Sequence, residues 1–86
     1  METVEVKEVI RDLITEIAED MEVDEEKITN SAHLIEDMDL DSMALLEVLA
    51  SMEKKFNISI PESEFSQLTS IDKCTVTVEK YLAEKV

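Results

Sequence analysis

A chain of 86 residues provides for one small domain and leaves no second domain that could close a cleft over a substrate. Its 22 acidic residues against 8 Lys and Arg give a formal charge of −14, which repels nucleic-acid phosphates and favours basic protein surfaces as partners. With no Gly, one Pro and 44% apolar residues, the composition is typical of a helical domain with a core and excludes a disordered acidic tail.

The first predicted element is an amphipathic helix over about residues 4–20, with Thr3 as its cap. Apolar residues recur on one face of this helix at helical spacing: Val6, Ile10, Leu13, Ile14, Ile17 and Met21. The acidic start METVEVKEV lacks the long apolar stretch of a signal peptide, and no run in the chain is long enough to span a bilayer. We therefore expect a soluble cytoplasmic protein without membrane insertion.

Residues 22–41 lose the helical period and are predicted to form a long connection. A connection of this length in so small a domain usually has a function. Scattered apolar residues should anchor it to the core: Val23, Ile28, Leu34 and Ile35.

A second helix is predicted from about Ser42 to Phe56, and its apolar residues fall on two faces. At about 100° per residue, one arc suits an ordinary core face: Leu45, Val48, Leu49, Met52 and Phe56. Outside this arc lies a second stripe of Met43, Leu46 and Ala50, bordered by Glu47 and Glu53. An apolar stripe with acidic borders predicts a docking surface for a partner with an apolar groove and a basic rim. Partial cover of the stripe by the long connection is the alternative.

The last third of the chain predicts two further helices. NISIP at residues 57–61 interrupts the helical pattern, and Pro61 can open a short third helix that carries Phe65 and Leu68. A final helix is expected over about residues 74–84. The predicted fold is all-α, a small four-helix bundle with three longer helices, one short third helix and a long connection between the first two.

Cys74 falls in step with Val78, Tyr81 and Leu82 at helical spacing, which predicts a small buried residue rather than a reactive thiol. The alternating β-branched residues at 75–78 are also compatible with a strand. A helix is favoured because no other segment of the chain supplies a partner strand.

Four carboxylates precede Ser42 in the stretch EDMDLDS, and a calcium loop is one interpretation of three of them. Asp37, Asp39 and Asp41 match the first ligand positions of an EF-hand loop. However, Ser42 replaces the turn glycine of that loop, and Val48 stands where it needs a bidentate Glu. We therefore expect weak divalent binding at these carboxylates and no specific metal site.

Ser42 itself is a candidate nucleophile or a candidate helix cap. His33 is the one histidine available as a base, the chain has no G-x-S-x-G elbow, and without glycine it has poor means of shaping an oxyanion hole. We therefore expect no enzyme, and we interpret His33 as a surface or loop-packing residue. Capping of the second helix by Asp41 or Ser42 is expected in any case, so it does not reveal what the serine is for.

The stretch EDMDLDSMALLEVLASMEKKFNISIPESEF resembles the central part of acyl carrier proteins. Their attachment motif is commonly an acidic pair, a Gly two residues later and then Asp-Ser-Leu, followed by a helix with a late Phe and by Ile-Pro. This chain supplies the matching residues in order: Glu36, Asp37, Asp41, Ser42, Met43, Glu47, Phe56, Ile60 and Pro61. The resemblance covers nearly the whole chain and implies one acyl-carrier-like domain over residues 1–86.

By this resemblance, Ser42 carries 4′-phosphopantetheine, added beside Asp41 by a separate phosphopantetheinyl transferase that uses coenzyme A and magnesium. The thiol of the arm would hold acyl groups as thioesters for enzymes of fatty acid, lipid or related biosynthesis. The implied partners are acyl-transfer, condensing or acyl-activating enzymes with basic rims, which a monomeric carrier would meet through one surface on the second helix. That surface comprises Met43, Leu46, Glu47, Ala50 and Glu53.

Several residues depart from the family's pattern. Asp39 stands where many members have Gly, Ala44 where fatty-acid carriers often have an acid, and Lys54 and Lys55 at positions that are often acidic. The segment TSIDKC at residues 69–74 looks longer than usual between the last two helices. These departures suggest a specialised carrier. A carrier of aminoacyl or polyketide intermediates and an acidic helical adaptor without a prosthetic group stay open as alternatives.

Overall fold

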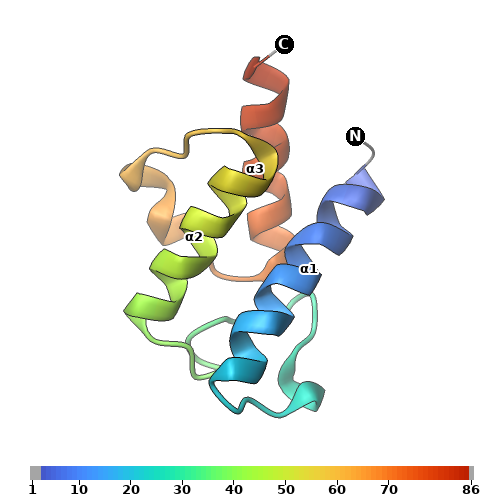
Figure 1. Ribbon diagram of the computed structural model, residues 1–86, viewed down its shortest axis with the longest axis vertical. Coiled ribbons are helices and arrows are strands. Elements are labelled where there is room, and N and C mark those ends of the chain that lie inside the picture. Colours follow the sequence, from blue (N-terminus) through green and yellow to red (C-terminus); the bar gives the residue numbers. More distant parts are fainter. Residues whose placement is uncertain (1–2, 86) are drawn as a thin grey trace.

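A computed structural model describes residues 3–85, which form three α-helices and two short 3₁₀-helices. The elements follow in the order α1 (Thr3–Asp20), η1 (Glu25–Lys27), α2 (Ser42–Phe56), η2 (Glu62–Gln67) and α3 (Ile71–Lys85). The start of α1 and the end of α3 lie at one end of the molecule, and the first turn of α2 lies at the other end (Figure 1). The predicted all-α bundle is confirmed, with η2 as its short third helix and η1 as an element that the sequence did not predict.

α1 contributes one face to the core, as its spacing predicts. Val6, Ile10 and Ile14 are completely buried on this face. Thr3, the expected cap, is itself the first residue of the helix. The prediction that Met21 belongs to this apolar face is wrong, because the helix ends at Asp20 and Met21 is 39% exposed.

The end of α1 is set by Glu22, which adopts a left-handed conformation with φ 61°. Its amide donates to the carbonyl oxygen of Glu19 at 3.0 Å, and the amide of Val23 donates to the carbonyl oxygen of Ala18 at 3.0 Å. These two bonds satisfy carbonyls that the helix end would leave unpaired, in the pattern of a Schellman motif. The turn therefore directs the chain back along the molecule without the usual glycine.

The long connection is anchored mostly as predicted. Ile28 and Leu34 are buried, and Val23 packs partly buried against the core. Ile35 is 45% exposed, so its prediction as an anchor is wrong. The amides of Asp37 and Met38 donate to the carbonyl oxygen of His33 at 2.9 and 3.1 Å, which makes residues 33–38 a helical turn. Residues four apart share a face of such a turn, so Met38 joins Leu34 in the core and Ile35 points outward.

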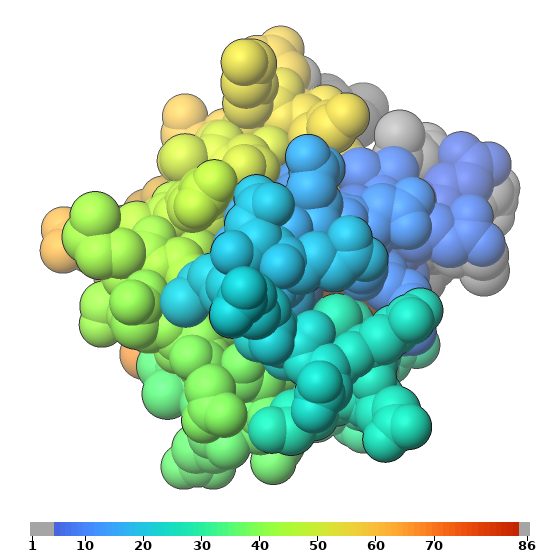
Figure 2. Space-filling view, turned by 60° about the horizontal axis from the view of Figure 1, so that its bottom comes forward, coloured from blue at the N-terminus to red at the C-terminus, as the bar shows by residue number. Residues whose placement is uncertain are grey.

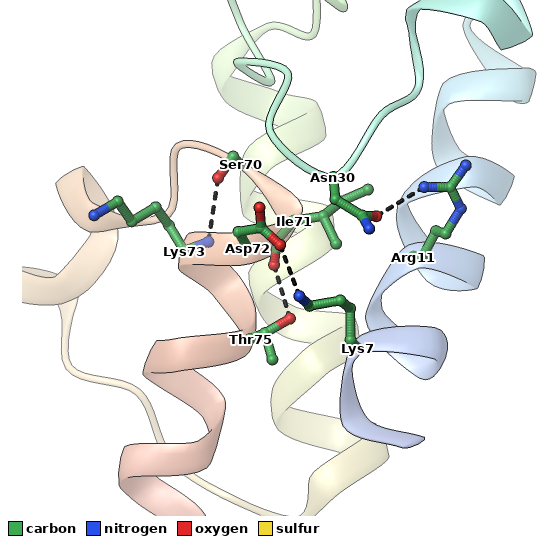
Figure 3. Close-up of polar contacts among 8 residues, drawn as sticks. All are labelled: Lys7, Arg11, Asn30, Ser70, Ile71, Asp72, Lys73 and Thr75. Atoms are coloured by element: carbon green, nitrogen blue, oxygen red, sulfur yellow. Dashed lines mark hydrogen bonds and ion pairs between the residues drawn. The ribbon is translucent and has the colours of Figure 1, made fainter. Parts of the chain in front are cut away.

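Polar contacts with α1 and α3 hold the long connection, residues 22–41, in place (Figure 3). The Arg11 guanidinium donates to Asn30 Oδ1 at 2.7 Å and to the carbonyl oxygen of Ile28 at 3.2 Å. The carbonyl oxygen of Asn30 accepts from the amide of Asp72 at 3.0 Å. Lys7 Nζ lies 2.9 Å from Asp72 Oδ1 and joins α1 to the first turn of α3. The connection is therefore held in place by both neighbouring helices.

α3 begins earlier than predicted, at Ile71 rather than near Cys74. Ser70 Oγ accepts from the amide of Lys73 at 3.1 Å, and this bond caps the helix at its amino end (Figure 3). Residues 69–74 therefore contain the start of a helix and not a long loop. The helix also covers residues 75–78, so the alternative of a strand there is wrong. Cys74 is completely buried, as predicted, and this burial raises the pKa of its thiol to about 12.

Candidate functional site

The amino end of α2 carries the serine that the sequence singles out. Asp41 has an extended backbone and is the cap residue, since its Oδ1 accepts from the amide of Ala44 at 2.9 Å. Ser42 is the first residue of the helix, and its side chain is exposed. Because Asp41 provides the cap, the Ser42 hydroxyl is placed at the positive end of the helix dipole without being needed to start the helix.

The residues just before Ser42 fix its position through one buried side chain. Leu40 is 1% exposed, and its amide donates to the carbonyl oxygen of Leu34 at 3.0 Å. Asp39 adopts a left-handed conformation with φ 58°, and its amide donates to the carbonyl oxygen of Ile35 at 3.0 Å. The turn at Asp39 therefore buries Leu40 and presents Asp41 and Ser42 to the surface.

His33 organises the turn that leads to the site. Its Nδ1 accepts from the amides of Ile35 and Glu36, both at 3.1 Å, and its own amide donates to Asp37 Oδ2 at 2.7 Å. These three bonds hold residues 33–37 in a turn around the imidazole ring. The half-buried His33 side chain is thus the loop-packing residue that the sequence predicts.

The three carboxylates considered as calcium ligands have separate partners. Asp37 binds the amide of His33, Asp41 binds the amide of Ala44, and Asp39 Oδ2 lies 3.9 Å from Lys27 Nζ. Within residues 3–85, no group of three or more His, Cys, Asp or Glu side chains is arranged to hold a metal ion. Weak divalent binding by the acidic surface stays a prediction that does not depend on such a group.

The two faces of α2 separate as the sequence predicts. Leu45, Val48 and Met52 are buried in the core. On the second stripe, Met43 is 74% exposed and Leu46 is 50% exposed. Ala50 and the bordering Glu47 are also exposed. The alternative that the connection covers the stripe is therefore wrong.

Glu53, on the other border of the stripe, is half-buried. Its Oε2 accepts from the amide of Ile60 at 2.8 Å and ties the end of α2 to the segment that leads into η2. Asn57 ends α2 in a left-handed conformation with φ 54°, and the amide of Ile58 donates to the carbonyl oxygen of Glu53 at 3.1 Å. Glu53 thus has a structural contact in addition to its predicted place on the partner surface.

An open groove of about 640 Å³ runs between α2 and η2 and reaches Ser42. Its apolar walls come from both sides: Leu46, Leu49, Ile60 and Phe65. The sequence predicts Leu49 on the core face of the second helix and Phe65 on the short third helix, but it does not predict the groove, because their meeting depends on how η2 packs. An apolar channel beside an exposed hydroxyl at a helix amino end is an arrangement that suits a phosphodiester-linked arm with an apolar cargo.

Comparison with known proteins identifies this arrangement. A family model described as "Phosphopantetheine attachment site" matches residues 11–74, which is more than half of the chain and includes Ser42. The chain is also 36% identical over 66 residues to an acyl carrier protein of Buchnera aphidicola subsp. Baizongia pistaciae, which covers 77% of this chain and 85% of that protein. The chain belongs to the acyl carrier protein family.

Other carriers of the family are similar to this one over most of their length. Polyketide-8 synthase acyl carrier protein 2 of Streptomyces avermitilis is 31% identical over 65 residues, 76% of this carrier and 71% of that protein. Acyl carrier protein AcpXL of Rhizobium meliloti is 33% identical over 69 residues, 80% of this carrier and 70% of that protein. These proteins bear different pathway names at similar identity, so they do not decide the pathway of this carrier.

The prosthetic group of this family is phosphopantetheine, and the residues at the start of α2 fit it. Ser42 offers an exposed oxygen, the helix amino end favours a phosphate, and the groove lined by Leu46 and Leu49 can take an apolar chain. Asp39 and Asp41 add repulsion toward the phosphate, which the helix dipole offsets in part. In the described part of this carrier, no helix has the length and apolarity needed to cross a membrane.

Proposed function

We propose that the protein carries acyl groups as thioesters on a 4′-phosphopantetheine arm attached to Ser42 and delivers them to enzymes of fatty acid, lipid or related biosynthesis. The observation that carries this proposal is the placement of Ser42 as the exposed first residue of a helix that Asp41 caps, beside an apolar groove. When bound, the arm supplies a thiol that forms and releases thioesters. The protein itself performs no bond-making step, and its residues position the arm and present it to partners.

Attachment needs a transferase with coenzyme A and magnesium. Ser42 Oγ forms a bond to phosphorus while the phosphoanhydride of coenzyme A breaks, and adenosine bisphosphate leaves. The serine proton passes to a base that the transferase supplies, and the Asp41 carboxylate continues to cap the helix through the amide of Ala44. Partner enzymes with basic rims are favoured because the carrier has a formal charge of −14.

Intact-mass measurement after incubation with coenzyme A, magnesium and a broad-specificity phosphopantetheinyl transferase tests the proposal. Wild-type protein is expected to gain the mass of one phosphopantetheine, and Ser42→Ala is expected to gain none. Ser63→Ala is the matched control, since Ser63 is another exposed serine on the same groove. The proposal fails if wild type gains no adduct or if the adduct survives Ser42→Ala.

A specialised carrier for polyketide intermediates is the second candidate, and the relative named for polyketide-8 synthase favours it. Ala44, Lys54 and Lys55 also give α2 a different charge pattern from the one that the family resemblance implies for general fatty-acid carriers. Isolation of the native protein and mass spectrometry of the thioester-bound group separate the candidates. A fatty acyl group supports the leading proposal, whereas a polyketide intermediate or an aminoacyl group replaces it.

A further inference from the structure

A second groove lies on the other side of Ser42 from the one between α2 and η2, where the end of α1 meets the first turns of α2. It has a volume of about 500 Å³. We call it the Met21 groove, and its lining residues are Met21, Asp41, Met43, Ala44, Leu46 and Glu47. Figure 2 shows the end of α1 next to the start of α2 on one face of the molecule. The groove thus combines the exposed apolar side chain of Met21, in the turn after α1, with those of Met43 and Leu46 on α2.

The walls of the Met21 groove are suited to a protein partner. Met21 is 39% exposed and Met43 is 74% exposed, although methionine side chains are normally covered in a small domain. Methionine is unbranched and polarisable, so two methionines that face one groove can adapt to side chains of different shapes. Leu46 extends the apolar surface along α2.

The charge around the groove indicates the chemistry of the partner. Asp41 and Glu47 are part of the lining. The segment from the second half of α1 through Met21 to η1, residues 12–26, contains eight acidic residues and no Lys or Arg. Residues 28–53, which include the α2 wall, also contain no Lys or Arg. A second copy of this acidic chain is repelled by such a surface, whereas a basic surface with a protruding apolar side chain is attracted.

We propose that phosphopantetheinyl transferase docks on the Met21 groove, with an apolar side chain inserted between Met21 and Met43 and with Lys or Arg residues beside Asp41 and Glu47. This inference rests on the proposed function, because the transferase must reach Ser42, and Asp41 of the groove adjoins Ser42 in sequence. It extends the partner surface from the second stripe on α2 to the end of α1. Met21 thus becomes a recognition residue that the α2 surface alone does not include.

Steady-state kinetics of phosphopantetheine transfer test the inference, with the carrier as the varied substrate. Met21→Ala is expected to raise KM about fivefold with little change in kcat, which is typical of a moderately important interface residue. Met21→Lys is expected to raise KM more than about tenfold, because it adds repulsion toward a basic partner. Val76 on α3 is the matched control, since it is 64% exposed and lies outside the groove. Val76→Ala and Val76→Lys are expected to leave KM unchanged.

A double variant tests whether Met21 and Met43 hold the same partner group. If they do, Met21→Ala combined with Met43→Ala raises KM by less than the product of the two single effects. Circular dichroism melting verifies that each variant is folded. Met21→Gln keeps the length of the side chain and repeats the test if the alanine variant is unfolded.

Several results overturn the inference while the proposed function stands. One is that Met21→Ala and Met21→Lys are modified with the KM of wild type. Another is that the Val76 variants raise KM as much as the Met21 variants do. A concentration-dependent dimer in sedimentation that Met21→Lys dissociates also overturns it, since the groove would then hold a second copy. If Ser42 of the wild type is never modified, both the proposed function and this inference are wrong.

Discussion

Substitution of Asp41 separates two roles that the structure gives to one side chain. Its carboxylate caps α2 through the 2.9 Å bond from the amide of Ala44, and it contributes negative charge beside Ser42. Asp41→Asn keeps an oxygen that can accept this bond and removes the charge. Asp41→Ala removes both, so the difference between the two variants measures the cap alone.

The magnitudes follow from the geometry of the cap. Loss of a capping side chain costs about 1 kcal/mol of folding free energy. Loss of a carboxylate from the positive end of the helix dipole costs about 0.3 kcal/mol at an exposed position such as this one. We therefore expect Asp41→Ala to lower the free energy of unfolding by about 1.3 kcal/mol and Asp41→Asn by about 0.3 kcal/mol. The alanine variant should melt about 5 to 10 °C below wild type.

Urea unfolding followed by circular dichroism measures the stabilities, and transferase kinetics at a temperature where all variants are folded measure the loading of Ser42. Both variants lose the same charge, so both should show a raised KM for the transferase, although only Asp41→Ala loses the cap. Equal destabilisation of the asparagine and alanine variants would refute the assignment of Asp41 as the capping residue. Wild-type KM in both variants would refute its role in recognition.

Four further predictions concern the turn at Glu22, the buried cysteine and the acidic surface. Glu22→Gly should raise the free energy of unfolding by about 0.5 to 1 kcal/mol relative to Glu22→Gln, because glycine adopts the left-handed conformation at φ 61° without strain. Urea titration measures both variants, and a lower stability of Glu22→Gly than of Glu22→Gln would contradict this prediction. Because burial raises the pKa of Cys74 from its ordinary 9.0 to about 12, iodoacetamide at pH 8 should label the folded protein only after the phosphopantetheine arm is attached, as intact mass can verify. The same raised pKa makes the folding stability depend on pH, because the thiol ionises more easily in the unfolded chain. The contribution of the neutral Cys74 thiol is complete below pH 9.0 and is lost as the pH rises toward about 12. The free energy of unfolding of wild type should therefore fall more between pH 8 and 10 than that of Cys74→Ala. Millimolar divalent cations should raise the melting temperature above that in sodium chloride of equal ionic strength, and no difference between the salts would contradict the prediction from charge.

Local patterns predicted the parts of this fold that local interactions decide. The two faces of α2 follow from residue spacing alone, and the exposure of Met43 opposite the buried Leu45 confirms the separation. The start of α2 followed from the acidic residue and serine before an apolar run, although the sequence left open whether Asp41 or Ser42 provides the cap. The structure decides for Asp41 because its side chain reaches the amide of Ala44.

The predictions that failed concern turns, where local hydrogen bonds and not the spacing of apolar residues decide which side chains are buried. The apolar pattern predicts Ile35 as an anchor, but in the turn at residues 33–38, which the hydrogen bonds of His33 stabilise, Met38 and not Ile35 joins Leu34 in the core. The start of α3 was placed too late although Ser70 is a regular capping residue, because the segment had been interpreted as an extended loop. Met21 continues the spacing of the core face of α1, but the helix ends at Asp20 and the left-handed turn at Glu22 leaves Met21 39% exposed.

The absence of glycine gives the site its particular character. All three left-handed residues in the described chain are polar: Glu22, Asp39 and Asn57. Asp39 stands where the family often has glycine, and its φ of 58° retains the left-handed turn that glycine would provide. The departure therefore keeps a left-handed residue at this position and adds a carboxylate, whose Oδ2 lies 3.9 Å from Lys27 Nζ. At the proposed attachment site, this chain therefore differs from the family's common pattern by an added negative charge, which we expect to favour partners with a basic surface.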